Sequence, residues 1–303
     1  MKQPSLVRYA WLSIAAALVT IALKAGAYFA TGSVGLLSDA LESLVNLAAA
    51  ILALFVLRTA EKPADDEHAF GHEKAEYFSS GAEGALIFIA AIAIVVTAVQ
   101  RLMHPRPVES LGLGVLIASG ASLVNFAVAR VLLSAAKKHR SITLEADGHH
   151  LMTDVWTSVG VLVGLFVVFV SKMPIFDPII AIGVAINILF TGSKLIFRSG
   201  MGLMDTALPK ADRDALATIL DGFKGDGALW HALKTRASGT RRFVSVHVLV
   251  PGDWTVRRGH DLLERIESAI RTRFDKCTVA THLEPVEDAR SWEDDGLDPA
   301  ATQ

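Results

Sequence analysis

The chain has 303 residues, a formal net charge of −2 and one cysteine, Cys277. The balanced charge argues against a nucleic-acid partner, and the single cysteine excludes an internal disulfide and a cysteine-rich zinc module. Hydrophobic residues form 52% of the chain and the mean hydropathy is +0.43, which is high for a soluble protein of this size.

The first two thirds of the chain contain six apolar stretches joined by short polar links. A helix that crosses a bilayer needs about 20 mostly apolar residues, and each stretch reaches or approaches that length. The short links argue against the alternative of one large buried helical core. We therefore predict an α-helical membrane domain of six transmembrane helices, over Tyr9–Phe29, Ser33–Leu57, Gly81–Leu102, Leu111–Leu133, Leu151–Phe169 and Phe176–Phe197.

The distribution of lysine and arginine predicts how these helices are oriented. Basic residues are concentrated in the N-terminus and in the links after the second and fourth stretches. Such an excess marks the cytoplasmic side of a membrane. We expect a multi-pass protein of the cytoplasmic (inner) membrane, held in the lipid bilayer with both termini in the cytoplasm.

The second stretch contains the polar run Ser-Asp-Ala-Leu-Glu-Ser-Leu-Val-Asn. Polar groups are expensive within hydrocarbon, so each one needs a partner or a function. Glu42 and Asn46 stand at positions i and i+4 and share one face of a helix. Asp39, three residues before Glu42, lies on nearly the same face and is an auxiliary candidate.

A second polar cluster lies in the link between the second and third stretches, in Pro-Ala-Asp-Asp-Glu-His-Ala-Phe-Gly-His. The residue types of Asp65, His68 and His72 suit zinc. Short loops also carry solvated histidines, so this motif alone leaves both interpretations open.

The start of the fifth stretch repeats the spacing of the second, with His150 and Asp154 at i and i+4. Two helices that each present two ligands can hold one ion between them. Together with Glu42 and Asn46 these residues offer two carboxylates, an imidazole and an amide, whose charge of −2 balances a divalent cation. The imidazole favours zinc, iron, cobalt or nickel over magnesium or calcium. The alternative is that such residues only join helices by hydrogen bonds, but two spaced pairs favour a metal site.

The composition becomes charged after Arg198, and from Pro209 the chain is no longer typical of a membrane span. Hydrophobic periodicity predicts a small α+β domain with the order α-β-β-α-β, and Ser238-Gly239 suits a hairpin link. The elements are a helix over Asp212–Phe223, strands over Leu233–Ala237 and Phe243–Val250, a helix over Thr255–Phe274 and a strand over Cys277–Leu283. The acidic tail from Glu287 is predicted to be disordered.

This small domain carries four of the ten histidines of the chain. Each histidine taken alone is more often a surface or core residue, but together they indicate a metal role. The candidate ligands are His231, His247, His260, His282 and Glu284.

These motifs resemble the cation diffusion facilitators, and most closely their bacterial ferrous-iron/zinc efflux branch. The resemblance covers about Leu6 to Pro285. It rests on Glu-Ser-Leu-Val-Asn, on Pro-Ala-Asp-Asp-Glu-His-Ala-Phe-Gly-His-Glu-Lys-Ala-Glu, on Ala-Asp-Gly-His-His-Leu-Met-Thr-Asp and on Asp-Thr-Ala-Leu-Pro.

The resemblance implies a homodimer that exchanges a divalent metal for protons. It implies a transport site at Glu42, Asn46, His150 and Asp154, a loop site at Asp65, His68 and His72, and a cytoplasmic binuclear site at His231, His247, His260, His282 and Glu284. It also implies a charge interlock near the dimer interface at Lys74 and Asp205, and a metallochaperone-like tail. The domains implied are a transport domain over 1–207, a regulatory and dimerisation domain over 208–287 and a disordered tail over 288–303.

The sequence departs from this branch at the transport site. The branch has aspartate at both positions of the second span, where this chain has Glu42 and Asn46, and the last tail ligand is Glu284 rather than aspartate. Asn46 removes a charge and cannot take up a proton. The metal that the site prefers is therefore not fixed by the resemblance.

The function that we expect is export of zinc or ferrous iron, with cadmium, cobalt, nickel and manganese as further candidates, by alternating access and proton antiport. The absence of a Gly-x-x-x-x-Gly-Lys-Ser/Thr loop argues against an ATP-driven pump. No His-Glu-x-x-His occurs, so we do not expect an intramembrane metalloenzyme or any other enzyme. The alternative is a non-transporting metal sensor or scaffold, in which Asn46 marks a degenerate site.

Overall fold

The computed structural model describes residues 5–31, 34–104, 112–173 and 175–293. The chain divides into two compact units, Met1–Met201 and Gly202–Gln303. The change of composition after Arg198 anticipated a boundary in this region. The two units are described separately.

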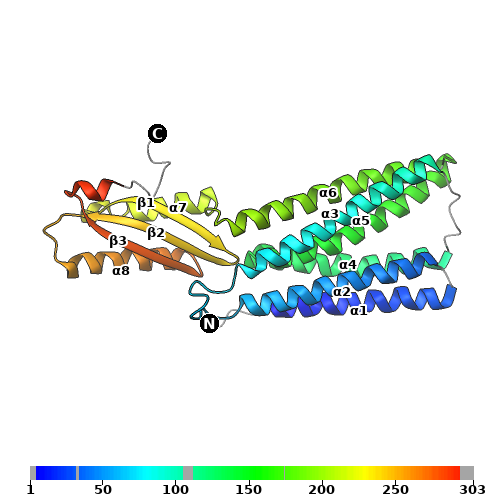
Figure 1. The fold of residues 1–303 in the computed structure, drawn as a ribbon, viewed down its shortest axis with the longest axis horizontal. Helices are drawn as coiled ribbons and strands as arrows, with labels where there is room; N and C mark the ends of the chain where they lie inside the picture. Colours follow the sequence, from blue (N-terminus) through cyan, green and yellow to red (C-terminus); the bar gives the residue numbers. More distant parts are fainter. Residues whose placement is uncertain (1–4, 32–33, 105–111, 174, 294–303) are drawn as a thin grey trace. The chain divides into compact units, whose positions relative to one another are not determined.

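The first unit consists of six long helices, which correspond one to one to the six apolar stretches (Figure 1). They are α1 (Val7–Thr31), α2 (Val34–Ala60), α3 (Ala75–Met103), α4 (Gly112–His139), α5 (Ile142–Ser171) and α6 (Phe176–Leu203). Within the described residues, four segments are long and apolar enough to cross a membrane: Val7–Gly26, Ala75–Met103, Ser119–His139 and Pro178–Leu203. The helices are thus confirmed, and crossing by all six stays a prediction.

The fifth helix begins at Ile142, earlier than the predicted start at Leu151. Ser141 caps it, because its hydroxyl accepts the N–H of Leu144, and the same hydroxyl donates to the buried carboxylate of Glu76 on α3. The extra turns place His150 inside a helix rather than at its beginning. The helix also carries its polar residues into the packed part of the unit.

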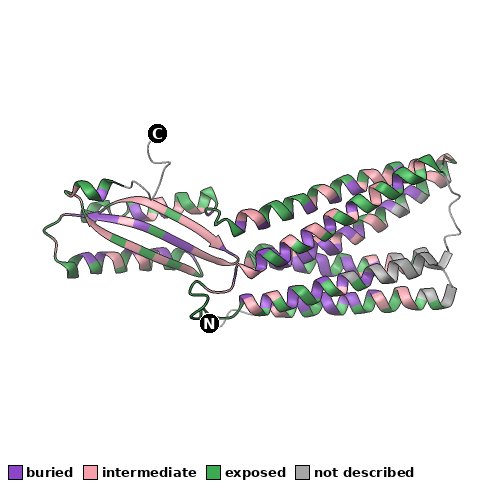
Figure 2. Cartoon of the chain, viewed as in Figure 1, coloured by how far each residue is buried: buried purple, intermediate pink, exposed green. Residues whose placement is uncertain are grey.

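Two clusters of buried apolar side chains meet at α5. Leu144 and Leu151 of α5 pack with α1, α2 and α4, whereas Ala146 packs with Ile87 of α3 and Ile188 of α6. Large apolar side chains cover much of the outer surface of the helices, where Figure 2 shows long exposed stretches. This distribution suits a bilayer, because hydrocarbon rather than water surrounds the outer faces.

Helices α3 and α6 approach closely where two glycines face each other. A Cβ atom built on Gly192 would lie 2.9 Å from the backbone nitrogen of Phe88 and 3.0 Å from the carbonyl oxygen of Gly84. Close backbone approach at small residues is the usual way in which membrane helices pack. Two turns further along α6, the hydroxyl of Ser199 forms a hydrogen bond of 2.5 Å with the hydroxyl of Ser80 on α3.

The second unit has the predicted order of helices and strands. Its elements are α7 (Lys210–Asp221), the 3-10 turn η1 (Lys224–Asp226), β1 (Leu229–Ser238), β2 (Arg241–Val250), α8 (Val256–Arg273), β3 (Cys277–Pro285) and the 3-10 turn η2 (Ala289–Trp292). Strand β2 is central, antiparallel to β1 and parallel to β3. The predicted hairpin is confirmed, with Gly239 at a φ of 53° in its turn.

One face of this sheet is covered by helices. Val244, Val246 and Val248 of β2 pack with Leu216 of α7 and Ile266 of α8 in a single apolar core. The alternation of a strand then turns His247 to the opposite face. The helices therefore bury one side of the sheet and leave the other side for polar groups.

The prediction of disorder from Glu287 is wrong for residues 289–292, which form η2. Asp288 caps this turn by accepting the N–H of Arg290, and the Ser291 hydroxyl donates to the carbonyl of Pro285 at 2.8 Å. The indole of Trp292 donates to the carbonyl of Val286 at 3.0 Å. These contacts hold the segment against the end of β3. Residues 294–303 lie outside the described part of the chain.

We predict that Gly192→Ala lowers the thermal unfolding midpoint of the detergent-solubilised protein. The added methyl group has no room against α3, and overpacking of this kind costs about 1–3 kcal/mol. Gly183→Ala is the matched control on the same helix, because no atom lies within 4 Å of its Cβ position. An equal midpoint for the two variants would show that the α3–α6 contact contributes nothing to stability.

Candidate metal sites

The first site lies between α2 and α5, where Asn46 joins both polar residues of the fifth helix. His150 Nε2 is 2.7 Å from Asn46 Oδ1, and Asn46 Nδ2 donates to Asp154 Oδ2. Because Asn46 Nδ2 donates to Asp154, the atom that faces His150 is Asn46 Oδ1. This oxygen accepts a hydrogen bond, so His150 Nε2 carries the proton. Asn46 and His150 are 5% and 8% exposed. The structure thus brings together three of the four predicted ligands.

The fourth predicted ligand is Glu42. Its backbone lies in α2 one turn before Asn46, but its side chain, like that of Asp39, lies outside the described part of the structure. The participation of these two carboxylates stays a prediction.

Helix α4 adds a residue that the sequence reasoning missed. Asn125 is 3% exposed, and its Nδ2 donates to Asp154 Oδ2 at 3.2 Å. Its Oδ1 is buried and accepts no hydrogen bond from the described residues, so an oxygen ligand is available there. The run Ser-Leu-Val-Asn occurs twice, ending at Asn46 and at Asn125, and this repeat was the signal that could have revealed it.

The chemistry of this site links a cation to protons. Hydrogen bonds already join these ligands to one another: Asp154 accepts from two amides, and His150 donates to Asn46. A cation that binds through His150 Nε2 must replace the proton on that nitrogen. Binding at this nitrogen therefore requires His150 to pass that proton to Nδ1 or to solution, and an imidazolium form would release one proton per ion.

The second candidate site lies in the link between α2 and α3, where the three predicted residues come together. Asp65 Oδ1 is 3.1 Å from His68 Nδ1, and Asp65 Oδ2 is 3.3 Å from His72 Nε2. The two imidazole rings are 4.4 Å apart. The three ligand atoms lie within 4.8 Å of one another, which is close enough to share one metal ion.

A backbone hydrogen bond keeps the carboxylate of this loop site in its charged form. The backbone N–H of His68, which donates to Asp65 Oδ1 at 2.7 Å, holds the pKa of the Asp65 carboxyl below its usual value. Asp65 is therefore ionised throughout the physiological range. This loop site therefore offers a cation one charged oxygen ligand beside the two imidazoles.

The third site is a row of histidines across the sheet of the second unit. His231 of β1 pairs with His247 of β2, and His247 pairs with His282 of β3. All three stand at the same level of the sheet. A β-bulge interrupts β1 between His231 and Lys234, and Ala232 there has a φ of 49°. Bulges of this kind redirect side chains, here next to the row.

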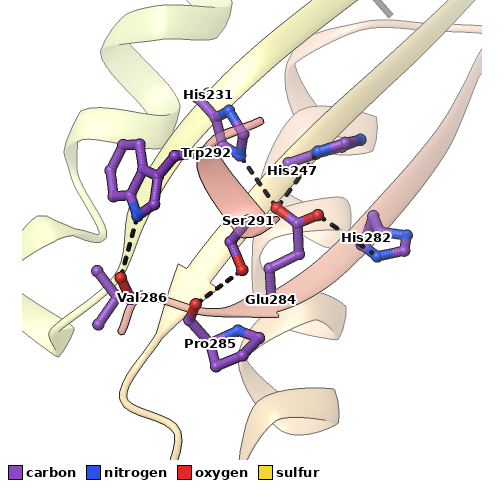
Figure 3. Close-up of polar contacts among 8 residues, drawn as sticks. All are labelled: His231, His247, His282, Glu284, Pro285, Val286, Ser291 and Trp292. Atoms are coloured by element: carbon purple, nitrogen blue, oxygen red, sulfur yellow. Dashed lines mark hydrogen bonds and ion pairs between the residues drawn. The ribbon is translucent and has the colours of Figure 1, made fainter. Parts of the chain in front are cut away.

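Glu284 gathers these histidines, because it follows His282 by two residues and shares its face of β3 (Figure 3). Its Oε2 lies 3.0 Å from His231 Nε2 and 3.3 Å from His247 Nδ1. Its Oε1 lies 3.6 Å from His282 Nε2. His231, His247 and Glu284 have ligand atoms within 4.8 Å of one another. The carboxylate can bridge two ions, one on each oxygen.

Two further features of the second unit bear on the predicted residues. Trp292 of η2 lies beside His231, with ring centroids 5.6 Å apart. His260 is exposed on α8, which packs on the other face of the sheet, so the structure does not bring it together with the other four residues.

The predicted interlock involves Lys74 and Asp205, which belong to different units of the chain. Asp205 accepts from Arg236 Nη1 at 3.1 Å within the second unit. Lys74 is the residue before the first turn of α3. The interlock stays a prediction.

Comparison with known proteins covers nearly the whole chain. The profile of the cation efflux transmembrane domain matches residues 10–204, and that of the cytoplasmic domain of cation efflux proteins matches residues 208–286. An uncharacterized transporter of Synechocystis, sll1263, is 54% identical over 94% of this chain and 92% of its own. The cation-efflux pump FieF of Klebsiella pneumoniae is 32% identical over 92% of each chain.

Solved structures of CzrB, described as a candidate zinc transporter, match a smaller part of the chain. One is 32% identical and covers 26% of this chain and 96% of the CzrB chain, with a TM-score of 0.25. A second, the zinc form, is 31% identical and covers 27% of this chain and 93% of its own, with a TM-score of 0.26.

We predict that zinc changes the fluorescence of Trp292 in a fragment that spans residues 202–293. An ion bound at His231 would alter the indole that lies beside it. Trp292→Phe should remove the signal and keep zinc binding by calorimetry. Trp254→Phe is the matched control and should keep the signal, because Trp254 stacks on Arg258 of α8 instead.

The variant with both His247→Ala and His282→Ala should lose most of the zinc binding of this fragment. It removes two imidazole ligands and leaves the core face of the sheet unchanged. Binding equal to that of the unaltered fragment would contradict the assignment of this site.

Proposed function

The chain belongs to the cation efflux family, and from this premise we propose that it exports a divalent transition-metal cation from the cytoplasm in exchange for protons. The observation that carries the proposal is the cluster of the buried Asn46 and His150 with the half-buried Asp154 within the helices of the first unit. Buried polar groups of this kind mark ion pathways in membrane proteins. Zinc and ferrous iron are the favoured substrates, because the cluster contains an imidazole.

Exchange for protons follows from the state of His150. A metal ion can bind His150 Nε2 only when that nitrogen carries no proton, so a doubly protonated His150 would release one proton on binding. Protons on the outer side compete for the same nitrogen and favour release of the metal. Alternating access of the site to the two sides then couples the two fluxes.

The other two clusters suit roles outside the transport step. The histidine row of the second unit would bind cytoplasmic metal and bias the transport equilibrium, as a regulatory ligand does when it favours one conformation. The match to the cytoplasmic domain of cation efflux proteins supports a homodimer joined in part through this unit. We propose the inner membrane as the location, with this unit in the cytoplasm.

A second candidate function is that of a membrane metal sensor that transports nothing. One observation favours it: the ligands of the membrane cluster satisfy one another through hydrogen bonds, and Asn46 contributes no charge. A helix-joining role for these residues requires no metal. Flux in sealed vesicles separates the two functions.

We predict that His150→Ala and Asp154→Ala each abolish zinc flux into vesicles that contain the purified protein, while the protein stays folded. Each change removes one metal ligand from a site that has few ligands. His149→Ala is the matched control on the same helix, because His149 faces Glu145 and the cations of α6 instead. Dissipation of the proton gradient should slow the flux of the unaltered protein. Normal flux in either ligand variant would remove the site assignment.

We predict that Asn46→Asp changes selectivity in favour of zinc over manganese or cobalt. A ligand charge a few ångströms from the ion is worth several kcal/mol before desolvation, and the offset differs among metals with their geometry and softness. The measurement is competitive flux of paired metals in the same vesicles. Asn187→Asp is the control, since Asn187 is exposed on α6.

If Asn46→Asp changes the flux of every metal by the same factor, Asn46 does not set selectivity. Flux that appears only in the Asn46→Asp variant would favour the sensor.

A further inference from the structure

A second pair of acidic side chains lies inside the first unit, apart from the metal ligands. Glu83 of α3 and Asp147 of α5 are 0% and 1% exposed. They lie close enough for their charges to repel each other. The apolar contact of Ile87 with Ala146 packs the same two helices beside them.

In each carboxyl group, one oxygen accepts a hydrogen bond and the other does not. Ser79 donates to Glu83 Oε1 at 3.1 Å, and Ser13 of α1 donates to Asp147 Oδ1 at 2.9 Å. The other two oxygens, Glu83 Oε2 and Asp147 Oδ2, are buried and accept no hydrogen bond from the described residues. The pair therefore presents two unpartnered acceptors in the interior of the membrane unit.

None of the interactions described for this pair involves a cation. The other charged groups on the neighbouring helices are engaged elsewhere: Glu145 pairs with Arg198, His149 faces Glu145 and Lys194, and Glu76 accepts from Ser141. His150 and Asp154 belong to the metal cluster. On α1 and α4, Arg8 and His139 pack against Tyr9, and Arg58 of α2 packs against Trp11. The side chains of Asp39 and Glu42 lie outside the described part of the structure.

Two like charges without a cation cannot both persist in a low-dielectric interior. The pair must hold a proton or a cation. A transition-metal ion requires about four ligands, whereas two oxygens are available here and both serine hydroxyls are already used as donors. A single proton, bound by either carboxyl, removes the repulsion and leaves one negative charge in place of two.

We propose that Glu83 and Asp147 form a proton-binding site that moves a proton in each transport cycle, separate from the site that binds the metal. This inference rests on the proposed function. It adds a titratable pair beside the metal site, where Asn46 cannot take up a proton. The proton comes from the outer solution and is released to the cytoplasm when the metal binds.

The coupling passes through α5. Asp147, His150 and Asp154 are spaced by three and four residues and so lie along one side of that helix. A shift of α5 that accommodates a metal ion also changes the distance between Asp147 and Glu83 on α3. The proton is held more strongly the closer the two carboxyls lie, so the metal and the proton bias the same helix position in opposite directions.

The test counts the protons released per zinc ion bound by the full chain in detergent, at near-neutral pH and low buffer capacity. A dye reports the protons and equilibrium dialysis reports the zinc. The double variant Glu83→Gln with Asp147→Asn should bind zinc with unchanged affinity when both are compared at high pH, and release about one proton fewer per ion. Glu76→Gln is the matched control, a buried glutamate on the same helix, and should release the same number as the unaltered protein.

An unchanged proton count in the double variant overturns the inference and leaves the pair as a helix-packing contact. Loss of zinc affinity at high pH also overturns it, because the carboxyls would then be metal ligands. If the double variant does not fold, the single variants Glu83→Gln and Asp147→Asn keep the size of each side chain, and an unchanged count in both overturns the inference. Failure of the unaltered protein to bind zinc would instead contradict the proposed function.

Discussion

The membrane unit depends on one constraint, which is that polar groups inside hydrocarbon must find their partners within the protein. Helix α5 concentrates these groups, and α1, α2, α3 and α4 each supply a partner to it through Ser13, Asn46, Glu76 and Asn125. The position of α5 is thereby fixed by polar contacts with four other helices. Any displacement of this helix must exchange those contacts for others, and a bound cation is a suitable replacement.

The second unit solves a different problem, because it must hold ionisable ligands at a water-exposed surface. It does so with strand register: His231, His247 and His282 occupy paired positions on three neighbouring strands. The apolar core on the opposite face keeps the sheet rigid without metal. The unit therefore does not need metal binding in order to fold. The free energy of metal binding can instead change how the unit associates with a second copy.

The sequence was sufficient to predict whatever depends on short spacing. The i, i+4 pairs placed Asn46 against His150 and Asp154, and strand alternation placed His247 on the polar face. Contacts between distant segments could not be read in this way. The early start of α5 depends on the contact between Ser141 and Glu76 of α3, and Asn125 enters the site only because α4 packs against α5. Residue type alone likewise could not show that His260 faces away from the other histidines.

The replacement of a charged ligand by Asn46 has a consequence for the whole membrane unit. A neutral amide lets Asp154 be held by donors when no metal is present, so the empty site carries less self-repulsion than one built with another carboxylate. The same change deprives the site of a group that can carry a proton. Of the two acids that repel each other, Asp147 lies one helix turn along α5 from His150, and Glu83 lies on α3. Asn46 leaves the interface of α2 and α5 with one carboxylate charge fewer, whereas the interface of α3 and α5 carries two carboxyl groups. Because these two acids are separate from the metal ligands, the metal ion and the proton are each bound by suitable groups. The histidine and the amides serve a transition metal, the carboxyl pair serves a proton, and a single rigid helix connects them.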